Sequence, residues 1–276
     1  MTARALCVGI NEFVNLPTGS WLKGCVNDAE DIAGWLVEKA GFSRDDITVL
    51  RDAEATKKNV WDALTAILDE PGVDRVVFTF SSHGTQIPNT DDDDEVDGVD
   101  EVFACYEMAA AGDDWDRNTV IVDDELRELF AKVDESVLVE VVLDTCHSGD
   151  GLRSLDLMPG RRPRFVPPPT VEGMRRIAAA AEPNRLRDLV KTIPAAARPV
   201  LYAACRSNQV ASDAHFDGRA NGAFTYNFLK ALGAGTAARA EILTQVKAAL
   251  VEGSFDQVPQ LEATAKAKKV PFGSSW

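Results

Sequence analysis

Short runs of β-branched and aromatic residues alternate with helical patterns along the first half of the chain. The runs at residues 5–10, 75–80 and 137–143 have the apolar density of strands that are buried on both faces. Between them, residues 27–40 and 56–68 carry apolar side chains at helical spacing. This alternation is typical of parallel strands joined by crossover helices. The sequence therefore predicts an α/β fold with a mostly parallel central sheet, whose functional residues follow the carboxyl ends of the strands.

The second half begins with a segment of different composition. Residues 151–197 are rich in Arg and Pro, and we expect a long excursion outside the sheet that is helical near residues 171–181. A strand at 199–204 and helices over 223–232 and 240–251 follow. At 276 residues, the length favours one domain. We divide it into a large region, the excursion and a small region, at residues 1–150, 151–197 and 198–276.

The net charge limits the partners of the chain. With 29 Lys and Arg against 44 Asp and Glu, it is −15, which disfavours nucleic acid and anionic membranes and favours a cationic substrate or metal ion. No stretch approaches the ~18 apolar residues of a membrane helix, and the run at residues 5–10 is too short for a signal peptide. Five scattered cysteines, an odd number, indicate reduced thiols in a cytoplasmic compartment.

Two predicted strands end in residues that can perform nucleophilic catalysis. His83 follows the run at 75–80, and Cys146 follows the run at 137–143. If these strands are neighbours, an imidazole lies beside a thiol and can take its proton. The backbone N–H groups of Gly84 and Cys146 are then donors for an oxyanion. A single Cys or His in such a position is usually structural, but the joint pattern favours catalysis.

The motifs at these strand ends resemble those of a known family. Ser-Ser-His-Gly-Thr-Gln at 81–86, the acidic stretch at 95–101 and Asp-Thr-Cys-His-Ser-Gly at 144–149 are similar to the metacaspase and prokaryotic orthocaspase branch of the caspase-like cysteine peptidases. Residues 22–29, 203–211 and 222–225 resemble further segments of that family, in the same order. The resemblance implies the caspase–hemoglobinase fold, with a sheet of about six strands and helices on both faces. It also implies a monomer.

The resemblance assigns roles to single residues. Cys146 is expected to attack a peptide carbonyl, with His83 as general base and acid. Asp28 and Asp144 are expected to line a pocket for a basic side chain, so the substrates are proteins or peptides cleaved after Arg or Lys. Asp28 can instead serve the N-terminus of a helix, and Cys25 either lines the same pocket or packs in the core. Alternative functions are an interaction module with little turnover, or a cysteine hydrolase or transferase acting on non-peptide substrates.

The acidic stretch raises the question of a metal. The thiol chemistry needs no cofactor, but calcium-dependent metacaspases use acids that resemble Asp97, Asp123 and Asp124, and such carboxylates suit Ca²⁺. Arg153 stands where those enzymes have a further acid, so the ligand set departs from the family pattern. A solvated acidic loop is the alternative interpretation.

The basic residues of the excursion also have two interpretations. They form a solvated surface, or one of them is a site of self-cleavage, and the candidates are Arg153, Arg161, Arg162 and Arg164. Two further histidines are weaker candidates for catalysis. We expect the side chain of His147 to turn away from its neighbour Cys146, and His215 to lie exposed in a polar loop at 212–219.

Overall fold

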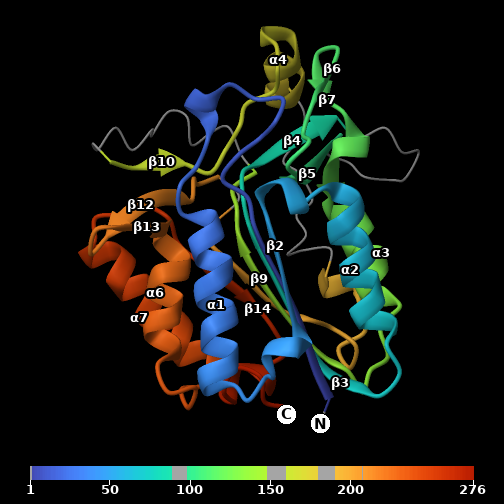
Figure 1. Ribbon diagram of the computed structural model, residues 1–276, viewed down its shortest axis with the longest axis vertical. Helices are drawn as coiled ribbons and strands as arrows, with labels where there is room; N and C mark the ends of the chain where they lie inside the picture. Colours follow the sequence, from blue (N-terminus) through green and yellow to red (C-terminus); the bar gives the residue numbers. More distant parts are fainter. Residues whose placement is uncertain (1, 89–97, 148–159, 180–189, 207) are drawn as a thin grey trace.

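A six-stranded sheet forms the centre of the computed structural model, which describes residues 2–88, 98–147, 160–179, 190–206 and 208–276 (Figure 1). The strand order is β14-β11-β9-β3-β1-β2, and only β14 runs antiparallel to its neighbour. The strands are β1 (Thr2–Gly9), β2 (Ile47–Arg51), β3 (Val73–Ser81), β9 (Leu138–Asp144), β11 (Val200–Ala203) and β14 (Gln260–Glu262). The predicted mostly parallel sheet of about six strands is confirmed.

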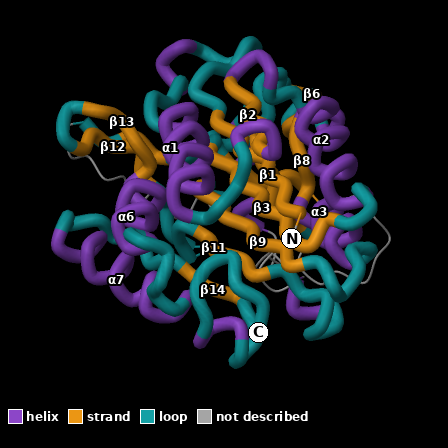
Figure 2. The backbone as a smooth tube through the Cα atoms, turned by 60° about the horizontal axis from the view of Figure 1, so that its bottom comes forward, coloured by secondary structure: helices purple, strands orange, loops and turns teal. Residues whose placement is uncertain are grey.

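Helices cover both faces of this sheet, as predicted (Figure 2). One face carries α1 (Cys25–Lys39), α6 (Ala223–Leu232) and α7 (Arg239–Glu252), and the other carries α2 (Lys57–Asp69) and α3 (Asp123–Ala131). Successive residues of β1 alternate between two apolar clusters, with Leu6 and Val8 in one and Ala5 and Cys7 in the other. Burial on both faces explains the nearly continuous apolar runs in the sequence. Among the described helices, we find none with the length and apolar character to cross a bilayer.

The start of α1 differs from the sequence prediction. The helix begins at Cys25, with Gly24 as its N-cap, two residues before the predicted helical pattern at 27–40. The N–H of Gly24 donates to the Asp213 carboxylate, and the N–H of Cys25 donates to the Asn11 side chain. These acceptors lie far away in the sequence, so local capping rules could not locate this helix start.

A second layer lies above the carboxyl ends of the central strands (Figure 1). It contains β4 (Gly84–Pro88), β5 (Val99–Ala104) and β8 (Val120–Val122), together with the short pair β6 (Ala110–Ala111) and β7 (Asp114–Trp115). The helix α4 (Val171–Ala179) lies beside them, where the sequence predicted a helix. Short 3₁₀ turns occur at Thr18–Ser20, Arg44–Asp46, Asp52–Glu54, Arg117–Thr119, Val190–Thr192 and Ala267–Lys269.

The excursion is less separate from the sheets than predicted. β10 (Arg162–Pro163) pairs with β12 (Ser212–Phe216), which pairs with β13 (Arg219–Gly222). The expected polar loop at 212–219 is therefore largely a hairpin, although His215 is exposed as predicted. The excursion stays outside the six-stranded sheet but adds a strand to a smaller one, because β12 offers backbone groups to pair with.

Candidate active site

The sheet register brings the ends of β3 and β9 together. The two strands are parallel neighbours, which is the condition for His83 and Cys146 to lie at one edge, and Ser81 pairs with Asp144. His83 and Cys146 each lie two residues beyond this pair. The backbones remain in contact there, because a Cβ on Gly84 would overlap the carbonyl oxygen of Cys146. Only glycine fits at position 84 without a shift of this edge.

The His83 ring is held by a backbone carbonyl. Its Nε2 lies 2.6 Å from the carbonyl oxygen of Ser20, and because a carbonyl only accepts, Nε2 carries the proton. Nδ1 is buried, and its own hydrogen-bonding capacity is not satisfied. The ring of Phe13 packs at 5.2 Å from the imidazole. Desolvation lowers the pKa of His83 to about 4, so at neutral pH the imidazole is uncharged and Nδ1 can accept a proton.

The thiol of Cys146 is buried at the end of β9. Its Sγ lies 2.6 Å from the carbonyl oxygen of Gln209, and the Sγ of Cys205 lies 3.4 Å from the same oxygen. Contact with the Cys146 thiol, together with desolvation, raises the pKa of Cys205 well above its usual range. In this arrangement the Cys146 thiol and the His83 ring each face a backbone carbonyl.

His147 turns away from the thiol, as the sequence suggested. Its Nδ1 lies 3.0 Å from the carbonyl oxygen of Val102, and its Nε2 lies 3.0 Å from the hydroxyl of Thr145. Desolvation lowers the pKa of His147 to about 4. Its ring packs edge-on against Phe103 at 4.6 Å, which is a structural environment.

An acidic pocket at the end of β9 holds the side chain of Arg164. The guanidinium is completely buried, and its nitrogens lie 2.6 Å from Asp28, 3.1 Å from Asp213 and 3.2 Å from Asp144. Desolvation lowers the pKa of Arg164, but the opposite effect of its neighbours is larger and raises the pKa well above its ordinary value. These neighbours are Asp144, Cys25, Asp28 and Asp213. The structure therefore brings the two predicted pocket acids, Asp28 and Asp144, around one basic side chain.

Backbone and side-chain donors from the small region hold these acids in place. Asp28 accepts hydrogen bonds from the Gly222 N–H at 3.0 Å and from the Asn221 amide at 3.0 Å. Asp144 accepts from the N–H and the hydroxyl of Thr225. Burial raises the pKa of Asp28 to about 7. A Cβ on Gly222 would overlap the Asp144 carboxylate and lie 2.7 Å from the guanidinium of Arg164, so this wall of the pocket needs glycine.

Cys25 lies at the start of α1, one turn before Asp28. Its side chain is buried, and desolvation raises its pKa well above the usual range, while the charge of Arg164 lowers it. The Cys25 thiol therefore lies near the Arg164 guanidinium, but the side chains that accept hydrogen bonds from this guanidinium are the carboxylates of Asp28 and Asp213.

The backbone around Arg164 lies between two segments of the chain, one at Gly84 and the other at Ala211. Its carbonyl oxygen accepts from the Gly84 N–H at 3.0 Å, and its N–H donates to the Ala211 carbonyl at 2.9 Å. On the following residues, the Val166 N–H donates to the Gly84 carbonyl at 3.1 Å. Together with the pairing of β10 and β12 and the bridge between Gly84 and Phe165, these bonds hold residues 162–166 across the site.

Four groups at this site were not identified from the sequence. Asp213 stands in a run of small and apolar residues, Val-Ala-Ser-Asp-Ala at 210–214, and an acid in such a run was the available signal. Gly222 and Thr225 lie in a segment assigned to the family pattern but without a role. The Ser20 carbonyl left no signal, because every residue has one.

A separate acidic cluster lies at the start of α3. One carboxylate oxygen from each of Asp100, Asp123 and Asp124 falls within 4.8 Å of the others, and Arg117 pairs with Asp100. The sequence named Asp123 and Asp124 as candidate ligands, and Asp100 belongs to the acidic stretch that raised the question of a metal. The third residue that it named, Asp97, lies outside the described residues, as does Arg153.

Comparisons with known proteins give one consistent answer. The family model described as the caspase domain matches residues 2–271. Metacaspase-1B from Neosartorya fischeri is 29% identical over 296 residues, covering 95% of this chain and 69% of that protein. Metacaspase-1 from Cryptococcus neoformans is 26% identical over 296 residues, covering 95% of this chain and 62% of that protein. A crystal structure of a protein from Geobacter sulfurreducens has a TM-score of 0.68 at 26% identity, covering 98% of this chain and 97% of that one.

Proposed function

Since this chain belongs to the caspase-domain family and is a caspase-like cysteine peptidase, we propose that it is an endopeptidase that cleaves after Arg or Lys. The observation that supports this specificity is the burial of the Arg164 guanidinium among Asp28, Asp144 and Asp213. An aspartate or glutamate side chain in the same pocket would face three carboxylates and would be repelled. A lysine ammonium satisfies the charge, although it cannot make the bidentate contacts of a guanidinium.

The mechanism follows from the groups around the Arg164 carbonyl. The Cys146 thiol gives its proton to Nδ1 of His83, and its sulfur attacks the carbonyl carbon of the residue in the acidic pocket. The N–H groups of Gly84 and Cys146 stabilise the negative oxygen, and the 3.0 Å bond from Gly84 to the Arg164 carbonyl supports the first of these roles. His83 then protonates the leaving amine, and water hydrolyses the thioester on Cys146. The Ser20 carbonyl keeps the His83 proton on Nε2 throughout.

We propose further that the chain cleaves itself between Arg164 and Phe165. Residues 162–166 pair with both edges of the site as a substrate strand would, and the side chain of Arg164 fills the pocket. A cavity of about 150 Å³ lies beside His83, Phe165 and Val166, where a leaving chain would pass. Until this bond is cut, the same segment excludes other substrates.

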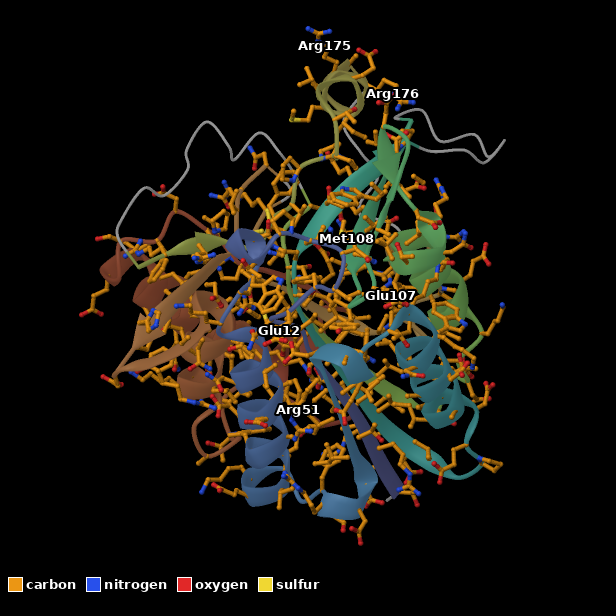
Figure 3. All side chains as sticks on the ribbon, turned by 45° about the horizontal axis from the view of Figure 1, so that its top comes forward. Glu12, Arg51, Glu107, Met108, Arg175 and Arg176 are labelled. Carbon is orange, nitrogen blue, oxygen red and sulfur yellow. The ribbon has the colours of Figure 1, made fainter. Side chains whose placement is uncertain are left out.

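Two other basic residues of the excursion, Arg175 and Arg176, are placed differently. Arg175 and Arg176 project from α4 away from the sheet, and they pair with surface acids (Figure 3). These two fit the interpretation of a solvated surface, which applies to α4 but not to Arg164.

Mass spectrometry tests the self-cleavage. The wild type should yield a fragment that begins at Phe165, whereas Cys146→Ala and Arg164→Gln should remain intact at this bond. Arg175→Gln is the matched control and should be processed like the wild type. Processing of Cys146→Ala, or a cut elsewhere in the wild type with Phe165 still joined to Arg164, would contradict the proposal.

Fluorogenic peptides test the specificity and separate the alternative functions. Peptides ending in Arg or Lys should be cleaved, a peptide ending in Asp should not, and Cys146→Ala should lose the activity. Absence of turnover on all three peptides by processed protein would favour an interaction module. Turnover of small thioesters alone would favour a hydrolase of non-peptide substrates.

We also propose that Asp100, Asp123 and Asp124 bind Ca²⁺. Three carboxylates within 4.8 Å suit a hard cation with oxygen ligands. Arg117 pairs with Asp100 and Arg127 pairs with Asp124, so a bound cation would share these carboxylates with the two arginines. Calorimetric titration with CaCl₂ should show binding that Asp123→Asn weakens at least tenfold. Asp134→Asn, which changes an exposed acid, should bind like the wild type. Equal affinity in all three proteins would exclude this site.

A further inference from the structure

A second thiol lies beside the sulfur of Cys146. The Sγ of Cys146 lies 2.6 Å from the carbonyl oxygen of Gln209, and the Sγ of Cys205 lies 3.4 Å from the same oxygen. Cys205 also lies 3.8 Å from the carbonyl oxygen of Thr145, the residue before Cys146. The two sulfurs therefore meet at one point, although they are far apart in the sequence. The proposed hydrolysis uses Cys146 and His83 and gives Cys205 no role.

Neighbouring strands of the central sheet deliver the two cysteines. β9 and β11 are parallel, and Leu143 pairs with Ala203 where the ladder ends. The Ala204 N–H then donates to the Leu143 carbonyl at 2.9 Å, so the two backbones stay together past the ladder. Cys146 and Cys205 follow within three residues of that pair. Adjacent strands lie ~4.8 Å apart, and the Cα atoms of bridged cysteines lie about 4.4–6.8 Å apart, so a disulfide can form here with little backbone movement.

Hydrogen bonds of Gln209 fix the carbonyl that both sulfurs contact. Its Oε1 accepts from the Val258 N–H at 2.9 Å, and its own N–H donates to the Arg206 carbonyl at 3.0 Å. These bonds come from outside residues 162–166, so they remain when that segment leaves the site. The backbone therefore holds Cys205 against the nucleophile before and after self-cleavage.

The two thiols differ in their readiness to react. Peroxides oxidise the thiolate form, and Cys146 is the proposed thiolate because His83 can take its proton. Contact with Cys146 and burial raise the pKa of Cys205, so Cys205 keeps its proton at neutral pH. The first oxidation therefore falls on Cys146, and Cys205 is the thiol that lies next to the oxidised sulfur.

We propose that hydrogen peroxide joins Cys146 and Cys205 in a reversible disulfide, which inactivates the peptidase. In the first step, the Cys146 sulfur takes an oxygen from the peroxide and becomes a sulfenic acid, and water is released. In the second step, the Cys205 sulfur attacks the sulfenic sulfur. An S–S bond forms, the S–O bond breaks, and the hydroxyl leaves with the Cys205 proton as a second water. The two sulfurs are oxidised, the peroxide is reduced, and a thiol reductant reverses the change by exchange.

Peptide mapping tests the disulfide without reference to activity. The full-length protein is treated with a slight excess of hydrogen peroxide, its remaining thiols are blocked with iodoacetamide, and the unreduced tryptic peptides are identified by mass spectrometry. The peptides that contain Cys146 and Cys205 should appear joined, with the loss of two hydrogen atoms. The other three cysteines, which are buried elsewhere, should remain thiols. Absence of the joined pair would overturn the proposal, whatever the activity of the treated protein.

Recovery of activity tests the reversible inactivation, with each protein compared with its own untreated sample. Under a large excess of peroxide, the wild type should lose activity on an arginyl peptide about tenfold or more and regain nearly all of it in dithiothreitol. Cys205→Ser should lose as much but regain less than about a third, because its Cys146 proceeds to the sulfinic acid, which dithiothreitol does not reduce. Cys7→Ala, which removes a buried thiol of β1, is the matched control and should recover like the wild type. Equal recovery of Cys205→Ser and the wild type would contradict the proposal.

This inference rests on the proposed role of Cys146 as the nucleophile, and the two fail in different ways. If no untreated protein cleaves the arginyl peptide, the proposed function fails, whereas the peptide map still decides whether the disulfide forms. If the joined pair forms in full and the wild type stays active, the inactivation is refuted, because Cys146 is then not the nucleophile.

Discussion

Removal of the Arg164 side chain should open the active site without any cleavage. In the intact chain, residues 162–166 compete with added peptide at a tethered concentration on the order of millimolar. Their strongest anchor is the guanidinium, which is fully buried against three carboxylates. Loss of one partner from a buried ion pair costs about 3–5 kcal/mol, which corresponds to a factor of about 100 or more in the occupancy of the active site by residues 162–166. The substitution Arg164→Ala should therefore release the segment and let water into the pocket.

Peptide binding measures this release without interference from catalysis. Both proteins carry Cys146→Ala, and one has Arg164→Ala in addition, while the matched control has Arg175→Ala. Fluorescence anisotropy of labelled Arg-Arg-Pro-Arg amide should give a Kd roughly 100-fold lower for the Arg164 variant than for the control. Circular dichroism establishes that both are folded. Equal Kd values in two folded proteins would refute the reasoning, because the segment would then not be held by its arginine.

Three further predictions follow from the buried groups. Gly222→Ala should reduce kcat/KM for arginyl peptides more than about 100-fold, because the new Cβ takes the space between Asp144 and the guanidinium, whereas Gly34→Ala, with open space around it, should keep full activity; equal activity of the two variants would contradict the shape of the pocket. Burial lowers the pKa of His147 from 6.5 to about 4, so the unfolded chain binds more protons in this window, and stability is full above about pH 6.5 and declines toward pH 4. Between pH 7.5 and pH 4.5, the free energy of unfolding in urea should therefore fall less for His147→Asn than for the wild type, by up to about 3 kcal/mol. The opposing shift of the Asp28 pKa to about 7 is common to both proteins. Identical losses of unfolding free energy would be inconsistent with a neutral buried imidazole. Arg239→Met should destabilise the fold by about 3–5 kcal/mol, since it leaves the buried Glu140 without its cation, whereas Arg219→Ala, which breaks a partly exposed pair with Asp31, should cost less than about 1 kcal/mol in the same urea assay.

Local patterns were sufficient to predict most elements of the central sheet. The helix over Ala223–Leu232 matches its predicted bounds, because its apolar residues recur at helical spacing and Gly233 follows it. The pairing of β3 with β9 was a condition of the sequence argument, and the structure supplies it. The start of α1 did not follow from the sequence, because its donors are satisfied by Asp213 and Asn11, which no local rule connects to it.

The residues of the active site likewise fall into those that the sequence identified and those that only the structure showed. His83, Cys146, Asp28 and Asp144 carry reactive or charged side chains at recognisable places in the chain, so their types and spacing were enough to select them. The Ser20 carbonyl that orients the imidazole was not predictable, because a backbone group leaves no trace in the residue type. Asp213 was missed because its partners, Arg164 and the N–H groups of Lys23 and Gly24, lie far from it in sequence.

The amino-acid order alone determined the alternation of strands and helices and the chemistry available at the strand ends, since both depend on neighbours within a few residues. It offered Arg153, Arg161, Arg162 and Arg164 as equivalent basic residues. Among the three that lie in the described residues, only the tertiary structure distinguished Arg164 from Arg161, by burying the Arg164 guanidinium among three acids and leaving Arg161 on an aromatic ring. The physical reason is that the strength of a charge interaction depends on distance and on exclusion of water, and both are properties of the folded chain.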